Sequence, residues 1–83
     1  MAEIKVNIES YGAVGVHLPT DLTIVCPAAS QVADVLAKID RQYPQAHEIL
    51  EKCACAIGDE MIARSYVLTQ NCTLVLLSPV AGG

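Results

Sequence analysis

Alternating apolar and polar residues mark the first part of the chain. Between residues 3 and 9, an apolar side chain occupies every second position, at Ile4, Val6 and Ile8. This period of two predicts a strand with one face buried. A second aliphatic stretch predicts another strand centred on residues 22–25, and the glycines within residues 11–15 supply a turn that lets the two strands pair as a hairpin.

Helical periodicity begins after Ser30, which we expect to be the N-cap of the helix. The apolar residues then recur at intervals of three and four, at Val32, Val35, Leu36 and Ile39. Asp34 lies near the positive end of the helix dipole, and Lys38 and Arg41 lie near its negative end. Pro44 ends the helix, because a proline ring without an N–H does not fit a helix interior.

The second half of the chain predicts shorter elements. A short helix is expected over residues 46–52, with Ile49 and Leu50 facing inward. Three strands are expected, at residues 53–57, 61–63 and 73–77. One main helix beside this many strands predicts the α+β class, with the helix covering one face of one sheet.

The last expected strand, residues 73–77, is apolar on both of its faces. A single helix covers only one face of a sheet, so the far side of this strand needs another explanation. Either it stays exposed and meets a partner, or the short second helix and the loops cover it. The pattern leaves both alternatives open.

Composition limits the class of protein. With 83 residues, of which 53% are hydrophobic and 17% charged, the chain suffices for one compact domain and is too apolar to be disordered. Polar residues at 69–71 interrupt its longest uncharged stretch, which speaks against a membrane span. The net charge of -4 speaks against nucleic acid, whose phosphates would repel the chain, and favours a basic protein partner.

The cysteines are expected to be reduced. The first residues alternate charged and apolar side chains, unlike a secretory signal, so we expect a cytoplasmic protein. Cys53 and Cys55 would lie on one face of a strand, about 6.6 Å apart, and they lack the Cys-x-x-Cys spacing of a zinc site. We therefore expect them to pack in the interior and the chain to bind no metal. Cys72, near a turn, is expected to be the most exposed thiol.

Other candidate catalytic residues are sparse. Neither His17 nor His47 has a cysteine or serine nearby in the sequence that would suggest a nucleophile and base, so we expect both to be solvated or at helix ends. The glycines in residues 12–15 lack the third glycine and the strand-to-helix setting of a dinucleotide-binding loop. These residues therefore predict a turn rather than a cofactor site.

The final residues differ in character from the rest of the chain. Pro79 prevents further pairing in the middle of a sheet, and Gly82 and Gly83 have no β-carbon to obstruct a narrow channel. Six extended residues reach about 20 Å. Such a tail is either a frayed end or a means of placing the Gly83 carboxylate in another protein's active site, after activation as an acyl-adenylate. We expect a folded domain at residues 1–77 and an extended tail at 78–83.

The join between the last strand and the tail resembles one known family. Residues 76–83 have the sequence Leu-Leu-Ser-Pro-Val-Ala-Gly-Gly, and residues 43–44 and 56–60 are also similar to that family's pattern. The chain resembles the ubiquitin-like sulfur carriers, and among them the small subunits of molybdopterin synthase. It departs from them at residues 69–72, where an acidic turn is common, and at Ser78, where a second proline is common.

The resemblance implies a β-grasp fold, in which a mixed sheet has its first and last strands side by side and one main helix crosses it. It also implies that an ATP-dependent adenylyltransferase of the ubiquitin-activating type adenylates Gly83, which then becomes a thiocarboxylate that donates sulfur. The tail residues implied to fit the partner's channel are Pro79, Val80, Ala81 and Gly82.

The resemblance further implies partners. The sulfur-accepting partner would be the large subunit of molybdopterin synthase, which holds the precursor and supplies the catalytic side chains in molybdenum cofactor biosynthesis. The chain would not be catalytic alone and would bind no cofactor, since ATP is used by the activating enzyme.

Three alternatives stay open. Related carriers deliver sulfur to thiamine, to cysteine or homocysteine, to siderophores or to transfer RNA. A ubiquitin-like modifier would instead be joined to target lysines through Gly83. A thiol-based redox or metal-binding module would use the four cysteines.

Overall fold

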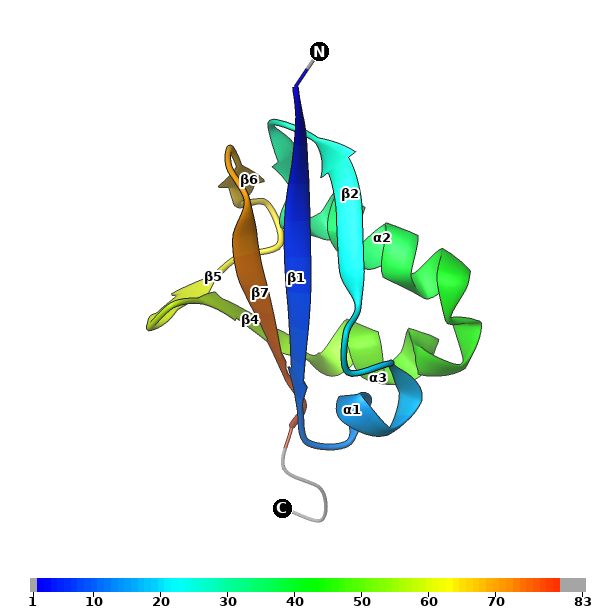
Figure 1. The fold of residues 1–83 in the computed structure, drawn as a ribbon. Helices are drawn as coiled ribbons and strands as arrows, with labels where there is room; N and C mark the ends of the chain where they lie inside the picture. Colours follow the sequence, from blue (N-terminus) through cyan, green and yellow to red (C-terminus); the bar gives the residue numbers. More distant parts are fainter. Residues whose placement is uncertain (1, 80–83) are drawn as a thin grey trace.

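A computed structural model describes residues 2–79 of the chain (Figure 1). Within these residues, five strands form one mixed sheet in the order β2-β1-β7-β4-β5. The strands of this sheet are β1 (Glu3–Tyr11), β2 (Thr23–Pro27), β4 (Ala54–Ile57), β5 (Glu60–Ile62) and β7 (Cys72–Leu77). The described part also contains a two-stranded sheet, in which β3 (Ser30–Gln31) pairs with β6 (Val67–Leu68).

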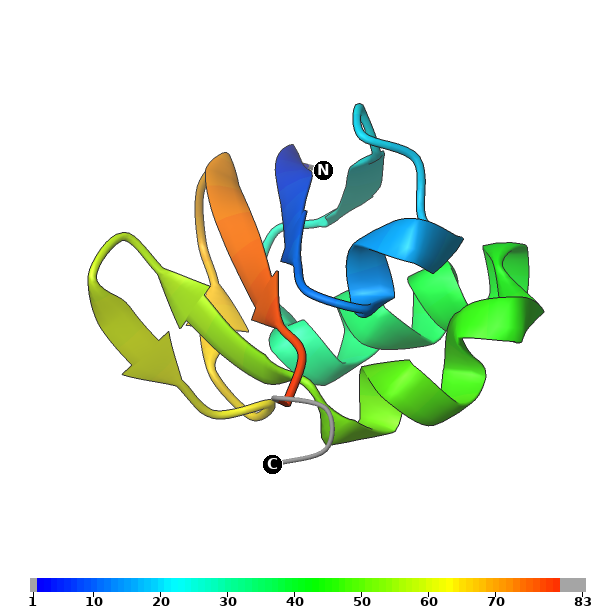
Figure 2. The same cartoon turned by 90° about the horizontal axis from the view of Figure 1, so that it is seen from below.

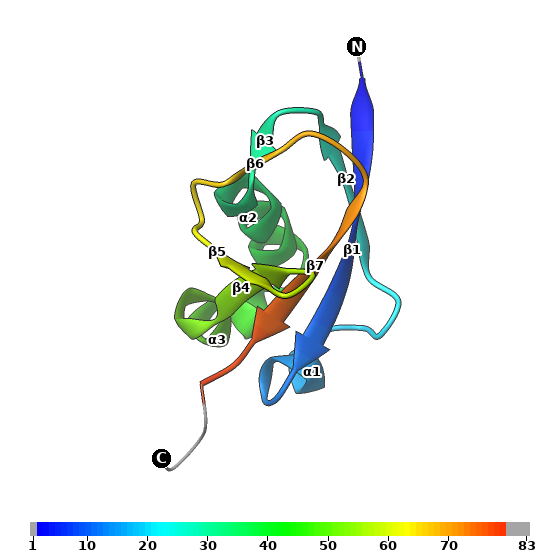
Figure 3. The same cartoon turned by 90° about the vertical axis from the view of Figure 1, so that its left-hand side faces the viewer.

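The longer helices, α2 and α3, lie on one side of the main sheet (Figures 2 and 3). The helical segments are α1 (Val14–His17), α2 (Val32–Gln42), the 3-10 helix η1 (Pro44–Ala46) and α3 (His47–Lys52). The main helix α2 crosses the sheet, and α3 is the short helix expected from the sequence. Among the described residues, no helix has the length and apolar character needed to cross a membrane.

The two strands furthest apart in the sequence, β1 and β7, pair in parallel at the centre of the sheet. Their register pairs Val6 with Cys72 and Tyr11 with Leu77. β2 pairs antiparallel with β1, as the expected hairpin, and β4 pairs antiparallel with β7. A mixed sheet with adjacent first and last strands and a crossing helix is the β-grasp arrangement, so the expected fold is confirmed.

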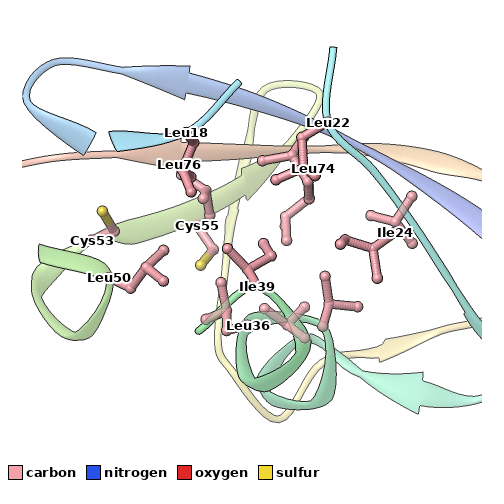
Figure 4. Close-up of a cluster of buried hydrophobic side chains, with 14 of the residues drawn as sticks. Leu18, Leu22, Ile24, Leu36, Ile39, Leu50, Cys53, Cys55, Leu74 and Leu76 are labelled. Carbon is pink, nitrogen blue, oxygen red and sulfur yellow. The ribbon is translucent and has the colours of Figure 1, made fainter. Parts of the chain in front are cut away.

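The core lies between α2 and the inner face of the sheet. The four apolar residues expected on the buried face of α2 are at most 6% exposed: Val32, Val35, Leu36 and Ile39. Figure 4 shows Leu36 and Ile39 pointing toward the β7 side chains Leu74 and Leu76. The inward residues of β1 complete this surface and are Ile4, Val6 and Ile8. The two amphipathic patterns seen in the sequence thus meet in one core.

The start of α2 differs from the sequence prediction. Gln31 is the N-cap, and its backbone N–H donates to Asp34 Oδ2 at 2.9 Å. Ser30 lies in β3, where its hydroxyl donates to the carbonyl of Pro27 at 2.7 Å and closes the preceding turn. The predicted Ser30 cap is therefore wrong, because this turn already uses the hydroxyl.

Three short elements are not evident in the hydrophobic pattern. The helix α1 has four residues; it begins within the turn expected at residues 11–15 and extends beyond it, and Gly12 makes the turn before it with a φ of 83°. β3 and β6 have two residues each. Elements this short have too few positions to display a helical or strand period.

The outer face of β7 is partly open. Its inward side chains, Leu74 and Leu76, are buried, whereas Val75 and Leu77 on the outer face are only half-buried. The short helix α3 does not cover this outer face, because its Leu50 packs into the same core as α2. Of the two alternatives for the last strand, the partly exposed face is the one observed.

Leu36 tests the assigned core. Truncating it to alanine should lower the free energy of unfolding by about 2–5 kcal/mol, because a buried leucine loses its contacts and leaves a cavity. This is a large part of the roughly 4–12 kcal/mol typical of a domain of this length. Urea denaturation measures the change. The control is Gln42→Ala at an exposed position of the same helix, expected within about 0.5 kcal/mol of wild type. An unchanged midpoint for Leu36→Ala would contradict the assigned core.

Candidate functional site

The predicted site lies at the limit of the described structure. Ser78 and Pro79 are the last described residues, whereas Gly83 and the predicted channel-fitting residues 80–82 lie outside the described residues. The structure therefore defines the root of the tail, where the chain leaves β7. In Figure 1, β7 ends beside α1, at the end of the sheet opposite the start of β1.

Ser78 ties this root to the loop that follows β1. Its backbone N–H donates to the carbonyl of Tyr11 at 3.1 Å, which extends the pairing of β1 and β7 by one residue. Its hydroxyl also donates to the Tyr11 carbonyl, at 2.9 Å, and accepts the backbone N–H of Val14 at 2.8 Å. The root of the tail is thus hydrogen-bonded to two positions 64 and 67 residues earlier in the sequence.

Gly12 provides the space for this contact. A β-carbon at position 12 would lie 3.1 Å from the β-carbon of Ser78 and 3.2 Å from its hydroxyl oxygen, closer than ordinary van der Waals contact. The φ of 83° at this position also favours glycine. The turn predicted at residues 11–15 therefore has a second role, which is to let the first loop approach the root of the tail.

Cys53 also lies near this root. Burial raises its pKa, and this effect exceeds the opposite effects of a hydrogen bond with the Ser78 side chain and the positive charge of Arg64. A buried thiol with a raised pKa stays protonated near neutral pH and is a weak nucleophile. Cys53 therefore lies near Ser78 without the properties of a catalytic cysteine.

Arg64 fixes the backbone around Cys53. One guanidinium nitrogen donates to the carbonyls of Leu50 at 2.9 Å, Glu51 at 3.1 Å and Cys53 at 2.9 Å. These carbonyls belong to the C-terminal end of α3 and the residue after it, where backbone acceptors have no partner within the helix. The sequence shows only an isolated arginine after β5, so this role could not be found without the fold.

The four cysteines all lie within the described residues and are free thiols. Cys26, Cys53 and Cys55 are buried, as expected for packing residues, and Cys72 is the more exposed one, also as expected. Burial raises the pKa of Cys55 and of Cys72 as well. Within residues 2–79, no three or more His, Cys, Asp or Glu side chains lie close enough together to hold a metal ion.

The described interior is almost entirely apolar. Among residues 2–79, every residue that is buried as a whole is aliphatic or a cysteine, and the Oγ atom of the half-buried Ser10 is the one covered side-chain polar atom without a hydrogen-bond partner. An internal catalytic centre needs polar groups at the reacting atoms. Any chemistry of this chain is therefore expected at its surface or at its ends.

The two histidines lie at helix ends and are exposed, as predicted: His17 ends α1 and His47 begins α3. His47 Nδ1 lies 2.9 Å from Asp40 Oδ1, and its Nε2 lies 3.7 Å from Glu51 Oε1. The contact with Asp40 links α2 to α3 across the break at η1, whereas Glu51 lies in α3 together with His47. The sequence pattern did not reveal the contact with Asp40, because the break changes the direction of the chain between Asp40 and His47.

Sequence comparison assigns the chain to a family. The model of the ThiS family matches residues 4–83, and the chain therefore belongs to the ThiS family. It is a ubiquitin-like sulfur carrier, as the resemblance of its last residues implied. A search of curated protein sequences gave no match.

Solved structures share the fold over nearly the whole chain. SAMP1 from Haloferax volcanii is similar with a TM-score of 0.83 and 14% identity, covering 95% of this chain and 99% of that one. A ubiquitin from Caldiarchaeum subterraneum is similar with a TM-score of 0.66 and 16% identity, covering 99% and 100%. A chain in the complex of subunits 1 and 2 of the molybdopterin-converting factor from Helicobacter pylori has a TM-score of 0.63 and 23% identity, covering 96% and 100%. At these identities the similarity establishes the fold.

The pKa of His47 provides a test of the link between α2 and α3. The hydrogen bond with Asp40 and the charges of Asp40, Glu51 and Glu48 raise this pKa above its usual 6.5. A raised pKa in the folded state means that the contact stabilises the protein fully below the unfolded pKa, and that this stabilisation is lost as the pH rises through the folded pKa.

We therefore expect an NMR titration of the His47 ring to give a midpoint above 6.5, which Asp40→Asn lowers. The stability difference between wild type and Asp40→Asn should shrink as the pH rises through that midpoint. Asp59→Asn, at an exposed position in another loop, is the control and should leave the midpoint unchanged. A His47 midpoint that does not respond to Asp40→Asn would contradict the contact.

Proposed function

We propose that this chain carries sulfur as a thiocarboxylate on Gly83. The observation that supports the proposal most is that the family match runs to residue 83 and so includes the Gly-Gly end. The apolar interior and the protonated Cys53 thiol also favour chemistry at the chain end over chemistry inside the domain. The folded domain then serves to present the tail to other proteins.

The proposed cycle uses ATP on the activating enzyme. The Gly83 carboxylate attacks the α-phosphorus of ATP, so that pyrophosphate leaves and an acyl-adenylate forms. A persulfide sulfur of the sulfur donor then attacks the acyl carbon and AMP leaves, which gives an acyl disulfide. A second thiol of the donor next attacks the donor's sulfur in the sulfur–sulfur bond, so that the thiocarboxylate of Gly83 leaves and the two donor cysteines form a disulfide. No side chain of residues 2–79 is required for these steps.

The proposed sulfur acceptor is a protein like the large subunit of molybdopterin synthase. This part of the proposal is supported by the Helicobacter pylori structure, in which subunits 1 and 2 of a molybdopterin-converting factor form a complex. Pro79 and residues 80–82 would enter the partner's channel, where the two glycines allow close approach. The precursor that accepts the sulfur would be held by the partner.

The outer face of the sheet is the surface proposed to meet these partners. Val75 and Leu77 of β7 are half-buried on this face, and each pairs with residues of the neighbouring strands β1 and β4. Leu77 pairs with Tyr11, which is 54% exposed, and Met61 of β5 is 63% exposed. Apolar side chains beside the root of the tail would keep the partner close to the point where the tail enters it.

A protein modifier is the second candidate, supported by the similarity in fold to a ubiquitin. The two candidates share the adenylation of Gly83 and differ in the fate of the activated acyl group. A carrier ends as a free thiocarboxylate, whereas a modifier ends in an isopeptide bond to a lysine of another protein. Mass spectrometry of the chain recovered from cells distinguishes the two products.

Intact mass tests the carrier directly. Incubation with the activating enzyme, ATP and a persulfide donor should add about 16 Da, because sulfur replaces one oxygen of the Gly83 carboxylate. A persulfide on an accessible cysteine such as Cys72 would instead add about 32 Da and would disappear with reductant. A gain of only the reducible mass would contradict the carrier function.

Shortening the tail tests whether function is separable from folding. Deleting Gly82 and Gly83 should abolish sulfur transfer, because the acyl carbon is then missing from its position, and errors of about 1 Å already cost about a hundredfold in rate. The melting temperature should be nearly unchanged, because terminal residues contribute little to a core. Ser65→Ala, at an exposed position outside the tail, keeps the tail intact and serves as the control, which should still be thiocarboxylated. Retained sulfur transfer by the deletion variant would count against Gly83 as the reactive residue.

A further inference from the structure

The helix α1 depends on the far end of the chain for its first hydrogen bond. Its N-cap is Ala13, whose methyl group cannot accept a hydrogen bond. The N–H of Val14, the first residue of the helix, has no acceptor inside a helix, and the Val14 residue is fully buried. The Ser78 hydroxyl supplies the acceptor at 2.8 Å.

Both polar groups of Ser78, its backbone N–H and its hydroxyl, are hydrogen-bonded. Its N–H and its hydroxyl both donate to the carbonyl of Tyr11, and the hydroxyl also accepts from Val14. The next residue, Pro79, has a fixed φ and restricts the backbone of Ser78 to extended conformations. The backbone direction is therefore fixed at Ser78, one residue beyond the end of β7.

We propose that Ser78 is a positioning residue for the adenylation of Gly83, an inference that rests on the function proposed above. By holding the root against Tyr11 and Val14, Ser78 removes the need to order residue 78 when the activating enzyme binds the tail. Its effect is exerted before binding, through the geometry of the free protein. Ser78 does not contact the reacting carboxylate and is not a catalytic residue.

Removing the hydroxyl has a defined kinetic consequence. In Ser78→Ala the bond to Val14 and one of the two bonds to Tyr11 are lost, so that residue 78 is held only by its own N–H and by Pro79 and has to be ordered further on binding. Fixing the backbone of one free residue corresponds to roughly 5- to 30-fold in an equilibrium constant, and the restraints that remain place the change below the upper end. We therefore expect a KM for the chain that is raised about tenfold and a kcat within about twofold of wild type, because the bound tail is the same in both proteins.

The experiment uses the full-length chain with the ubiquitin-activating-type adenylyltransferase of the source organism. ATP–pyrophosphate exchange at varied concentrations of the chain gives KM and kcat for wild type, Ser78→Ala, Ser78→Thr and Ser65→Ala. Ser78→Thr keeps the hydroxyl and should have a KM within about threefold of wild type, well below that of Ser78→Ala. Ser65→Ala removes an exposed hydroxyl outside the site and should leave both constants unchanged.

Hydrogen exchange of the Val14 amide measures the contact without any enzyme. The exchange should be at least about tenfold faster in Ser78→Ala than in wild type, because the buried N–H loses its acceptor. The same amide should be protected in Ser78→Thr and in Ser65→Ala. Unchanged exchange of the Val14 amide in Ser78→Ala would contradict the hydrogen bond on which the proposal rests and would overturn it.

The remaining outcomes separate this inference from the proposed function. If the wild-type chain supports ATP–pyrophosphate exchange and Ser78→Ala has the same KM, the positioning role alone would be overturned. A raised KM that Ser78→Thr does not restore would do the same, because the effect would not come from the hydroxyl. Wild-type chain that is never adenylated would overturn the proposed function itself, and the positioning role with it.

Discussion

The parallel pairing of β1 with β7 is the constraint on which the rest of the structure depends. The last strand lies at the centre of the sheet, parallel to the first. The chain therefore leaves the sheet at the same end at which β1 turns into α1. This geometry brings Tyr11, Gly12 and Val14 against Ser78, although at least 64 residues separate them in the sequence. A tail that followed an edge strand would have neighbours on one side only.

The two faces of the sheet differ in how far they are covered. The inner face packs against α2 and α3, and the described residues that are buried as a whole are aliphatic or cysteines. A chain of 83 residues has little surface to spare for an internal active site, so packing uses the whole interior. The outer face of β7 remains half-buried, and its apolar side chains continue up to the root of the tail.

The sequence predicted the elements that have a long enough pattern. The apolar residues of β1 recur at every second position and those of α2 at helical intervals, in elements of 9 and 11 residues, and both elements were assigned to the correct buried face. The helix α1 and the strands β3 and β6 have two to four residues and show no period. At the site, the Gly-Gly end indicated the chemistry through family resemblance. The bonds from Ser78 to Val14 and from Arg64 to the end of α3 join residues far apart in sequence, so only the fold reveals them.

A chain that carries an activated acyl group must also avoid reacting with itself. In the proposed cycle, Gly83 lies five residues beyond Ser78, and the thiol of Cys53 lies beside Ser78. A thiolate there would compete with the persulfide donor for the acyl-adenylate and form a thioester. Burial raises the pKa of Cys53 and leaves the residue only 6% exposed, so the thiol is both protonated and covered. The position of this cysteine in the core therefore stabilises the fold and, in the proposed cycle, would keep its thiol from the acyl group.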